Sequence, residues 1–135
     1  MITTEITLTA QFYDLDPMGV VWHGHYARFL EQARCQLLDK IGYNYIEMQA
    51  SGFIWPIVDI QTKFIRPIRF HQNFIVAATL VEFENRLKIE YIIRDAASSE
   101  VLTKAHTTQI AVNAATNELC LESPAIFTDK LKGVV

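Results

Sequence analysis

One segment of the sequence, residues 12–26 (FYDLDPMGVVWHGHY), concentrates the side chains that could do chemistry. It holds two carboxylates, Asp14 and Asp16, and two imidazoles, His23 and His25. A connection between secondary-structure elements is usually short and polar, whereas this one also carries valines and a tryptophan. Carboxylates held beside apolar groups are those whose pKa values shift and which become reactive. The segment is therefore the first candidate for a catalytic site.

Asp16 allows two interpretations that its neighbours leave open. A carboxylate directly before a proline such as Pro17 is common in turns, where local backbone N–H groups satisfy it. The same carboxylate can act as a nucleophile or a general base toward a carbonyl group. For Asp14 we favour the structural interpretation, as a loop or helix-capping carboxylate.

The His-x-His pair invites a metal-site interpretation, because two imidazoles and nearby carboxylates can hold a metal ion. His23 and His25 fall at the start of a predicted helix. There a two-residue step separates side chains by about 200°, given 3.6 residues per turn. We therefore expect no metal site. Either imidazole could orient Asp16 or a substrate, or could be packed or solvated without a catalytic role.

Hydrophobic residues at helical spacing follow this segment and predict one long helix that begins near Tyr26. The stripe consists of Tyr26, Phe29, Leu30, Ala33, Leu37, Leu38 and Ile41. Gly42 is a natural stop, because glycine readily adopts the left-handed conformation that ends helices. The breadth of the stripe indicates that other structure covers the helix. On the polar face, Glu31 is expected to be structural and to pair with Arg28 or Arg34.

Alternating hydrophobic and polar residues predict five β-strands around this helix. The predicted strands cover residues 2–13, 54–64, 74–83, 87–94 and 101–113. Short turns join the last four, which forces neighbouring strands into antiparallel pairs. Residues 44–50 could form a further helical turn, and Ser123-Pro124 begins either a short terminal helix or a fraying tail. A five-stranded antiparallel sheet covered by one helix is an α+β architecture.

The strand predicted over residues 74–83 is apolar at nearly every position, so both of its faces should be covered. A lone two-layer domain would place polar side chains on the outer face of its sheet. We therefore expect the outer face to contact another subunit.

The composition restricts the class of protein. A chain of 135 residues is expected to form one domain over residues 1–135. Half of the residues are hydrophobic and 20% are charged, which is typical of a globular protein. The net charge of −3 and the lack of a basic stripe argue against a nucleic-acid partner.

The lack of targeting signals and of a disulfide framework predicts an ordinary cytoplasmic protein. No stretch approaches the ~18 apolar residues of a membrane span, and residues 1–10 lack the basic and apolar regions of a signal peptide. The two cysteines, Cys35 and Cys120, provide no disulfide framework, and Cys35 is predicted to be a reduced thiol in the core.

Two adjacent motifs carry a family resemblance. Residues 14–26 read D-x-D-P-x-G-V-V-W-H-x-x-Y, and residues 28–34 read R-F-x-E-x-A-R. Together they resemble the signature of hotdog-fold acyl-CoA thioesterases, closest to the 4-hydroxybenzoyl-CoA thioesterase-like group. The resemblance implies a five-stranded antiparallel sheet wrapped around one long α-helix, homodimers or homotetramers, and no metal or organic cofactor.

The same resemblance implies roles for individual residues. The catalytic aspartate of the family matches Asp16, and the peptide N–H that polarises the thioester carbonyl matches the backbone of His23. Gly24 N–H could share that role, and Trp22 and Tyr26 could line the substrate pocket. For both aromatic side chains the alternative is plain core packing.

The resemblance implies hydrolysis of an acyl thioester of coenzyme A to the free acid and thiol. Three alternatives stay open. The acyl group could arrive on an acyl carrier protein, the chain could bind acyl groups without turnover, or a hydratase could use an Asp/His pair on the same fold. Aromatic residues near the loop suit an aryl, short or long acyl group equally well.

Overall fold

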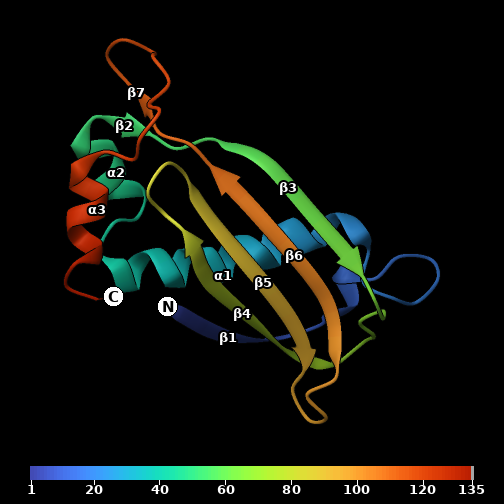
Figure 1. Cartoon of the computed structure of the whole chain (residues 1–135). Helices are drawn as coiled ribbons and strands as arrows, with labels where there is room; N and C mark the ends of the chain where they lie inside the picture. The colour runs from blue at the N-terminus through green and yellow to red at the C-terminus, as the bar shows by residue number, and fades with distance from the viewer. Residues whose placement is uncertain (135) are drawn as a thin grey trace.

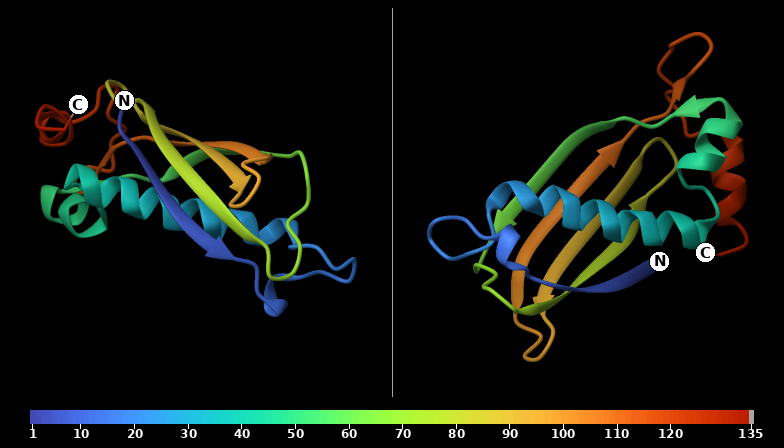
Figure 2. Two further views of the ribbon diagram at one scale, coloured as in Figure 1. Left: turned by 90° about the horizontal axis from the view of Figure 1, so that it is seen from below. Right: turned by 180° about the vertical axis from the view of Figure 1, so that it is seen from behind.

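A five-stranded antiparallel sheet curves around one long helix in the computed structural model, which describes residues 1–134 (Figures 1 and 2). The sheet contains β1 (Thr3–Thr9), β3 (Ile57–Phe64), β4 (Asn73–Glu82), β5 (Leu87–Asp95) and β6 (Val101–Gln109). Their spatial order is β1-β4-β5-β6-β3. The other elements are α1 (Tyr26–Ile41), α2 (Tyr45–Ser51), α3 (Ala125–Leu131) and a small β2–β7 pair (Phe53–Ile54 and Val112–Asn113). Within the described residues, no helix is long and apolar enough to cross a membrane.

Helix α1 has the bounds and the buried stripe that its hydrophobic spacing predicts. Every member of the predicted stripe from Tyr26 to Ile41 is buried. The helix ends at Gly42, whose φ of 81° is left-handed and whose N–H donates to the carbonyls of Leu38 and Asp39. The apolar face of α1 lies on the concave side of the sheet, and the core forms between them.

Three predicted strands are shorter than the alternation indicates, and the one over residues 54–64 divides into β2 and β3. The first ends at Thr9, and residues Phe12–Asp14 form a 3₁₀ turn, because the Asp14 carboxylate accepts the N–H of Gln11 at 2.9 Å. The last divides in two: β6 ends at Gln109, and β7 pairs with β2 instead of continuing along the main sheet. The predicted helix near residues 44–50 and the terminal helix are confirmed as α2 and α3.

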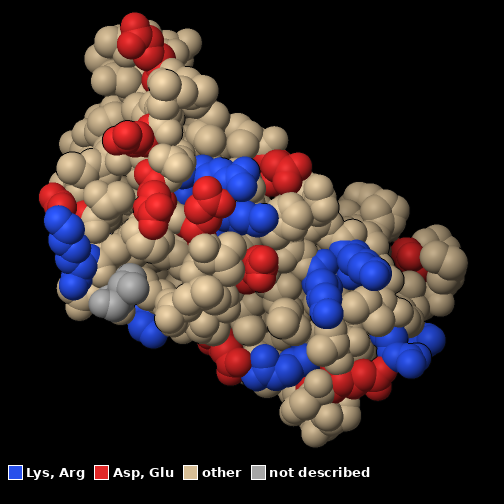
Figure 3. Space-filling model, in the orientation of Figure 1, with Lys and Arg blue, Asp and Glu red and all other residues tan. Residues whose placement is uncertain are grey.

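The two faces of β4 differ in burial. Its inward side chains, Phe74, Val76, Ala78 and Leu80, are buried, while the outward Ile75 and Val81 are half-buried. The outer face of the sheet carries interspersed acidic and basic side chains among uncharged ones (Figure 3). A subunit contact on this face therefore stays a prediction.

Strand β3 is an edge of the main sheet with an exposed apolar surface. It pairs with β6 on one side, and no described strand pairs with its other side. Val58, Ile60 and Phe64 are about half exposed, at 52%, 47% and 50%. An exposed apolar edge strand is a template for pairing with another chain.

Candidate active site

The loop before α1 folds back on itself at the end of the molecule where α1 begins (Figure 1). The N–H of Asp16 donates to the carbonyl of Val20 at 2.8 Å, and the N–H of Gly19 donates to the carbonyl of Asp16 at 3.0 Å. Gly19 has a φ of 78°, a left-handed conformation that costs glycine little. The turn therefore holds the Asp16 side chain at a fixed place beside the helix start.

The Asp16 carboxylate is half-buried and only partly satisfied. Its Oδ1 accepts the N–H of Met18 at 2.8 Å and, more weakly, the N–H of Val20 at 3.4 Å. Among residues 1–134, no hydrogen-bond donor contacts Oδ2. The two interpretations of Asp16 are thus compatible, because one oxygen stabilises the turn and the other is available for chemistry.

Asp14 is a buried structural carboxylate that joins the loop to α1. Its side chain is 3% exposed, and Oδ1 accepts from the Arg28 guanidinium at 2.6 Å. Its backbone carbonyl accepts the N–H of Trp22 at 2.9 Å. The structural interpretation is therefore confirmed. Arg28 binds Asp14 rather than Glu31, which lies 3.7 Å from Arg34 instead.

A 3₁₀ turn of residues His23–His25 leads into α1 and leaves backbone donors free. In residues 1–134, no acceptor receives the N–H of His23 or of Gly24. Unpaired N–H groups at a helix start carry partial positive charge, which attracts negative charge. These two donors suit an oxygen on which negative charge develops.

Gly24 is required by close packing. A Cβ built on Gly24 would lie 2.4 Å from two ring atoms of Trp22, far inside contact distance. The rings of His23 and His25 each have their centroid 5.3 Å from that of Trp22. The indole thus packs against the turn and holds its shape.

Three of the predicted site residues line one cavity of about 260 Å³: Asp16, His23 and Tyr26. Its other lining residues are Met18, Val20, Val21, Phe64, Ile65, Arg66 and Pro67. Tyr26 is buried, and burial raises its pKa, with an opposing contribution from the Thr103 side chain. The predicted residues Trp22 and Gly24 adjoin this cavity through His23 but do not line it. The contribution of Phe64–Pro67 was not predicted, because only the fold brings the end of β3 to this loop.

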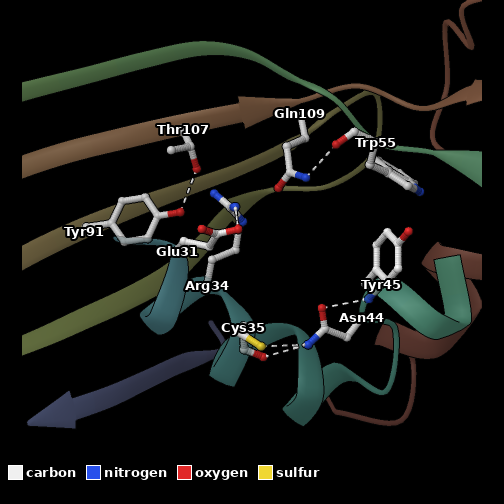
Figure 4. A network of polar contacts seen from close by, with 9 residues as sticks. All are labelled: Glu31, Arg34, Cys35, Asn44, Tyr45, Trp55, Tyr91, Thr107 and Gln109. Carbon is white, nitrogen blue, oxygen red and sulfur yellow. Dashed lines mark hydrogen bonds and ion pairs between the residues drawn. The ribbon is translucent and has the colours of Figure 1, made fainter. Parts of the chain in front are cut away.

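A second, larger cavity of about 570 Å³ lies between α1, α2 and the start of β3. Its wall includes Trp55 and Pro56, which join β2 to β3. Cys35 is exposed on its rim and accepts from Asn44, so the prediction of a core thiol is wrong (Figure 4). Gln109 also lines it and was missed, although a polar residue at an inward position of β6 was a usable signal.

Both the sequence and the fold match known proteins. The model of the thioesterase-like superfamily matches residues 10–130, so the chain belongs to that superfamily. The predicted hotdog fold is confirmed by solved structures. The DHNA-CoA thioesterase of Staphylococcus aureus has a TM-score of 0.80 and 26% identity, covering 90% of this chain and 81% of that one.

Two relatives in sequence cover different shares of the chain. A Synechocystis protein assigned as an esterase is 27% identical over 128 residues, which is 94% of this chain and 77% of the relative. An Arabidopsis chloroplast acyl-acyl carrier protein thioesterase is 34% identical over 76 residues. That match covers 56% of this chain and only 40% of the relative.

Proposed function

We propose that the protein hydrolyses an acyl thioester of coenzyme A to a carboxylic acid and free coenzyme A. The observation that carries this proposal is the single cavity lined by both Asp16 and His23. The proposal is supported by the partly satisfied carboxylate of Asp16 and by the unpaired backbone N–H of His23, two residues that line the same cavity. Membership of the thioesterase-like superfamily supports the same reaction class.

Asp16 acts through its Oδ2 in one of two ways. As a general base it takes a proton from water, whose hydroxide adds to the thioester carbon. As a nucleophile it attacks that carbon itself, and water then cleaves the resulting anhydride. In both routes the carbonyl oxygen gains negative charge beside the N–H of His23 and Gly24. The C–S bond breaks, and the thiolate of coenzyme A leaves and takes up a proton.

A second copy of the chain completes the site through the free edge of β3. Antiparallel pairing of two β3 strands about Gln61 places Asp59 opposite Lys63 of the partner subunit. The same register places Val58 opposite the partner's Phe64. Opposite charges therefore face each other, and so do these two apolar side chains. Further pairing of dimers through the outer sheet face would give the homotetramer, one of the two assemblies that the family resemblance implies.

This register also joins the two cavities across the interface. Ile65 of the Asp16 cavity comes opposite the partner's Ile57, which lines the cavity between α1 and α2. Any antiparallel pairing of full-length strands brings the end of one beside the start of the other. The thioester carbon would thus sit at Asp16 while its acyl group extends into the partner subunit.

An acyl carrier protein is the second candidate carrier of the acyl group. The match to the Arabidopsis acyl-acyl carrier protein thioesterase favours it, at 34% identity over 76 residues. Docking of an acidic carrier would weaken steeply as salt rises. Turnover of one acyl group on both carriers at increasing salt separates the two functions.

A thioester panel tests the proposed function. Short, long and aryl acyl groups on coenzyme A are assayed with the wild type and with Asp16→Ala. We expect turnover of at least one thioester by the wild type and a large loss in the variant. Tight binding of product acids without any turnover would instead indicate a non-catalytic acyl-binding subunit.

A further inference from the structure

The buried Asp14 carboxylate joins the start of the loop to the helix that follows it. Its Oδ2 accepts the N–H of Gln11 at 2.9 Å, where the chain leaves β1. Its Oδ1 accepts from the Arg28 guanidinium at 2.6 Å, on the first turn of α1. Removing one partner of a buried charge is costly, so the carboxylate holds the loop firmly against the helix start.

A short antiparallel hairpin begins at the same residue. The backbone carbonyl of Asp14 accepts the N–H of Trp22 at 2.9 Å, and the N–H of Asp16 donates to the carbonyl of Val20 at 2.8 Å. One arm of the hairpin therefore carries Asp16. The other arm leads directly into His23, which follows Trp22 in the chain.

The ion pair closes a ring that contains both groups of the proposed site. From Asp14 the ring follows the hairpin to His23, enters α1, and returns from Arg28 to Asp14 through the 2.6 Å contact. Asp16 and His23 are both members of this ring, and both line one cavity. The ion pair therefore fixes how the hairpin sits on the helix start.

A displacement of the hairpin would change the proposed reaction more than the stability of the fold. The N–H of Val21 donates to the carbonyl of Ile68 at 2.8 Å, so the β3–β4 connection still holds the hairpin when it is released from α1. The side chain of Arg28 is 44% exposed, so its removal opens no cavity in the core. A shift of about 1 Å in a reacting group can nevertheless lower a rate about a hundredfold.

We propose that the Asp14–Arg28 ion pair aligns the Asp16 carboxylate with the backbone N–H of His23. Asp14 and Arg28 do not line the cavity, so they are positioning residues that act through the hairpin. This inference rests on the proposed thioesterase function and deepens it, because alignment matters only if both groups act on one thioester.

Amide hydrogen exchange tests the anchoring without any turnover. The reporters are the N–H groups of Trp22 and Asp16, which bond across the hairpin. We expect both to exchange at least about tenfold faster in Arg28→Ala, because the hairpin is released from α1. The matched control is Arg86→Ala, since Arg86 is 47% exposed and bonds Glu82 at 2.9 Å beside the β4–β5 turn, at the other end of the molecule (Figure 1). Unchanged exchange of both reporters in Arg28→Ala would overturn the inference, whatever the protein does to thioesters.

The split between kcat and KM tests the positioning itself. Arg28→Ala, Arg28→Lys and Arg86→Ala are compared with the wild type on the best thioester of the panel. We expect kcat to fall at least about tenfold in Arg28→Ala with KM nearly unchanged, because alignment and not binding is lost. A lysine can supply the one donor that Asp14 Oδ1 accepts, so Arg28→Lys should recover most of kcat, and Arg86→Ala should match the wild type.

Two results would contradict the inference and leave the proposed function intact. One is a wild-type kcat in folded Arg28→Ala, and the other is a loss of kcat that Arg28→Lys does not repair. Absence of turnover in the wild type would instead contradict the proposed function, and the exchange experiment would still decide whether the ion pair anchors the hairpin.

Discussion

Individual residues of the loop divide into those that build it and those left free for chemistry. Asp14 and Asp16 are two positions apart, yet Asp14 is buried in an ion pair with Arg28 and Asp16 lines a cavity. The difference comes from the 3₁₀ turn and the tight turn that follow each other in the loop. The types of these residues indicated chemistry, but only the backbone path assigns one carboxylate to structure and the other to the cavity.

Gly24→Ala tests the packing of the helix start. The added methyl group would overlap the Trp22 ring, so one of them must move. We expect a destabilisation of about 1–3 kcal/mol, as for other overpacked sites, measured by chemical denaturation. In a Trp22→Ala background the same substitution should cost much less. Gly133→Ala, where the nearest atom lies 4.0 Å away, is the control; equal costs at both glycines would refute the packing role.

The elements that position the site were largely predictable, and the exceptions have physical reasons. Helix α1 follows directly from its apolar stripe and Gly42. The first strand ends at Thr9 rather than near Tyr13, because Asp14 caps a turn that alternation alone does not reveal. Gln109 was missed as a lining residue because the cavity forms against α1, α2 and β3, elements that are distant from β6 in the sequence.

The burial of Tyr91 on β5 predicts a loss of stability at alkaline pH. Burial raises the pKa of Tyr91 above its ordinary value of 10.0, with a smaller opposing contribution from the hydrogen bond to Thr107. The folded state therefore holds this proton more tightly than the unfolded chain. Its contribution to stability is complete below pH ~10 and is lost as the pH rises through the folded pKa.

Denaturation curves at pH values from 8 to 11 measure this effect. We expect the free energy of unfolding to fall less steeply above pH 10 in Tyr91→Phe than in the wild type. Tyr45→Phe is the control, because Tyr45 is 71% exposed. Identical slopes for the wild type and Tyr91→Phe would show that this tyrosine makes no such contribution.

At the scale of the whole molecule, the proposed pairing of two β3 edges predicts how charge changes alter assembly. Lys63→Glu would face Asp59 of the partner subunit, and like charges across an interface cost several kcal/mol. We expect the dimer dissociation constant of Lys63→Glu to be at least about tenfold higher than that of the wild type, since each 1.4 kcal/mol is a factor of ten. Sedimentation over a dilution series measures this.

Swapping both charges tests the proposed register. In Asp59→Lys combined with Lys63→Glu, opposite charges face each other again, so dimerisation should recover. Lys130→Glu, exposed on α3 and away from both the β3 edge and the outer sheet face, should leave assembly unchanged. If the double variant dimerises as weakly as Lys63→Glu alone, this result would contradict the register about Gln61.

The most direct measurement is the kcat/KM of Asp16→Asn for the best thioester of the panel, beside that of the wild type. Asparagine retains an oxygen for the N–H of Met18, so the melting temperature should change little. Because the amide can neither take a proton from water nor attack the carbonyl, we expect kcat/KM to fall at least ~100-fold. A folded Asp16→Asn protein that retains full activity would mean that another group attacks the thioester.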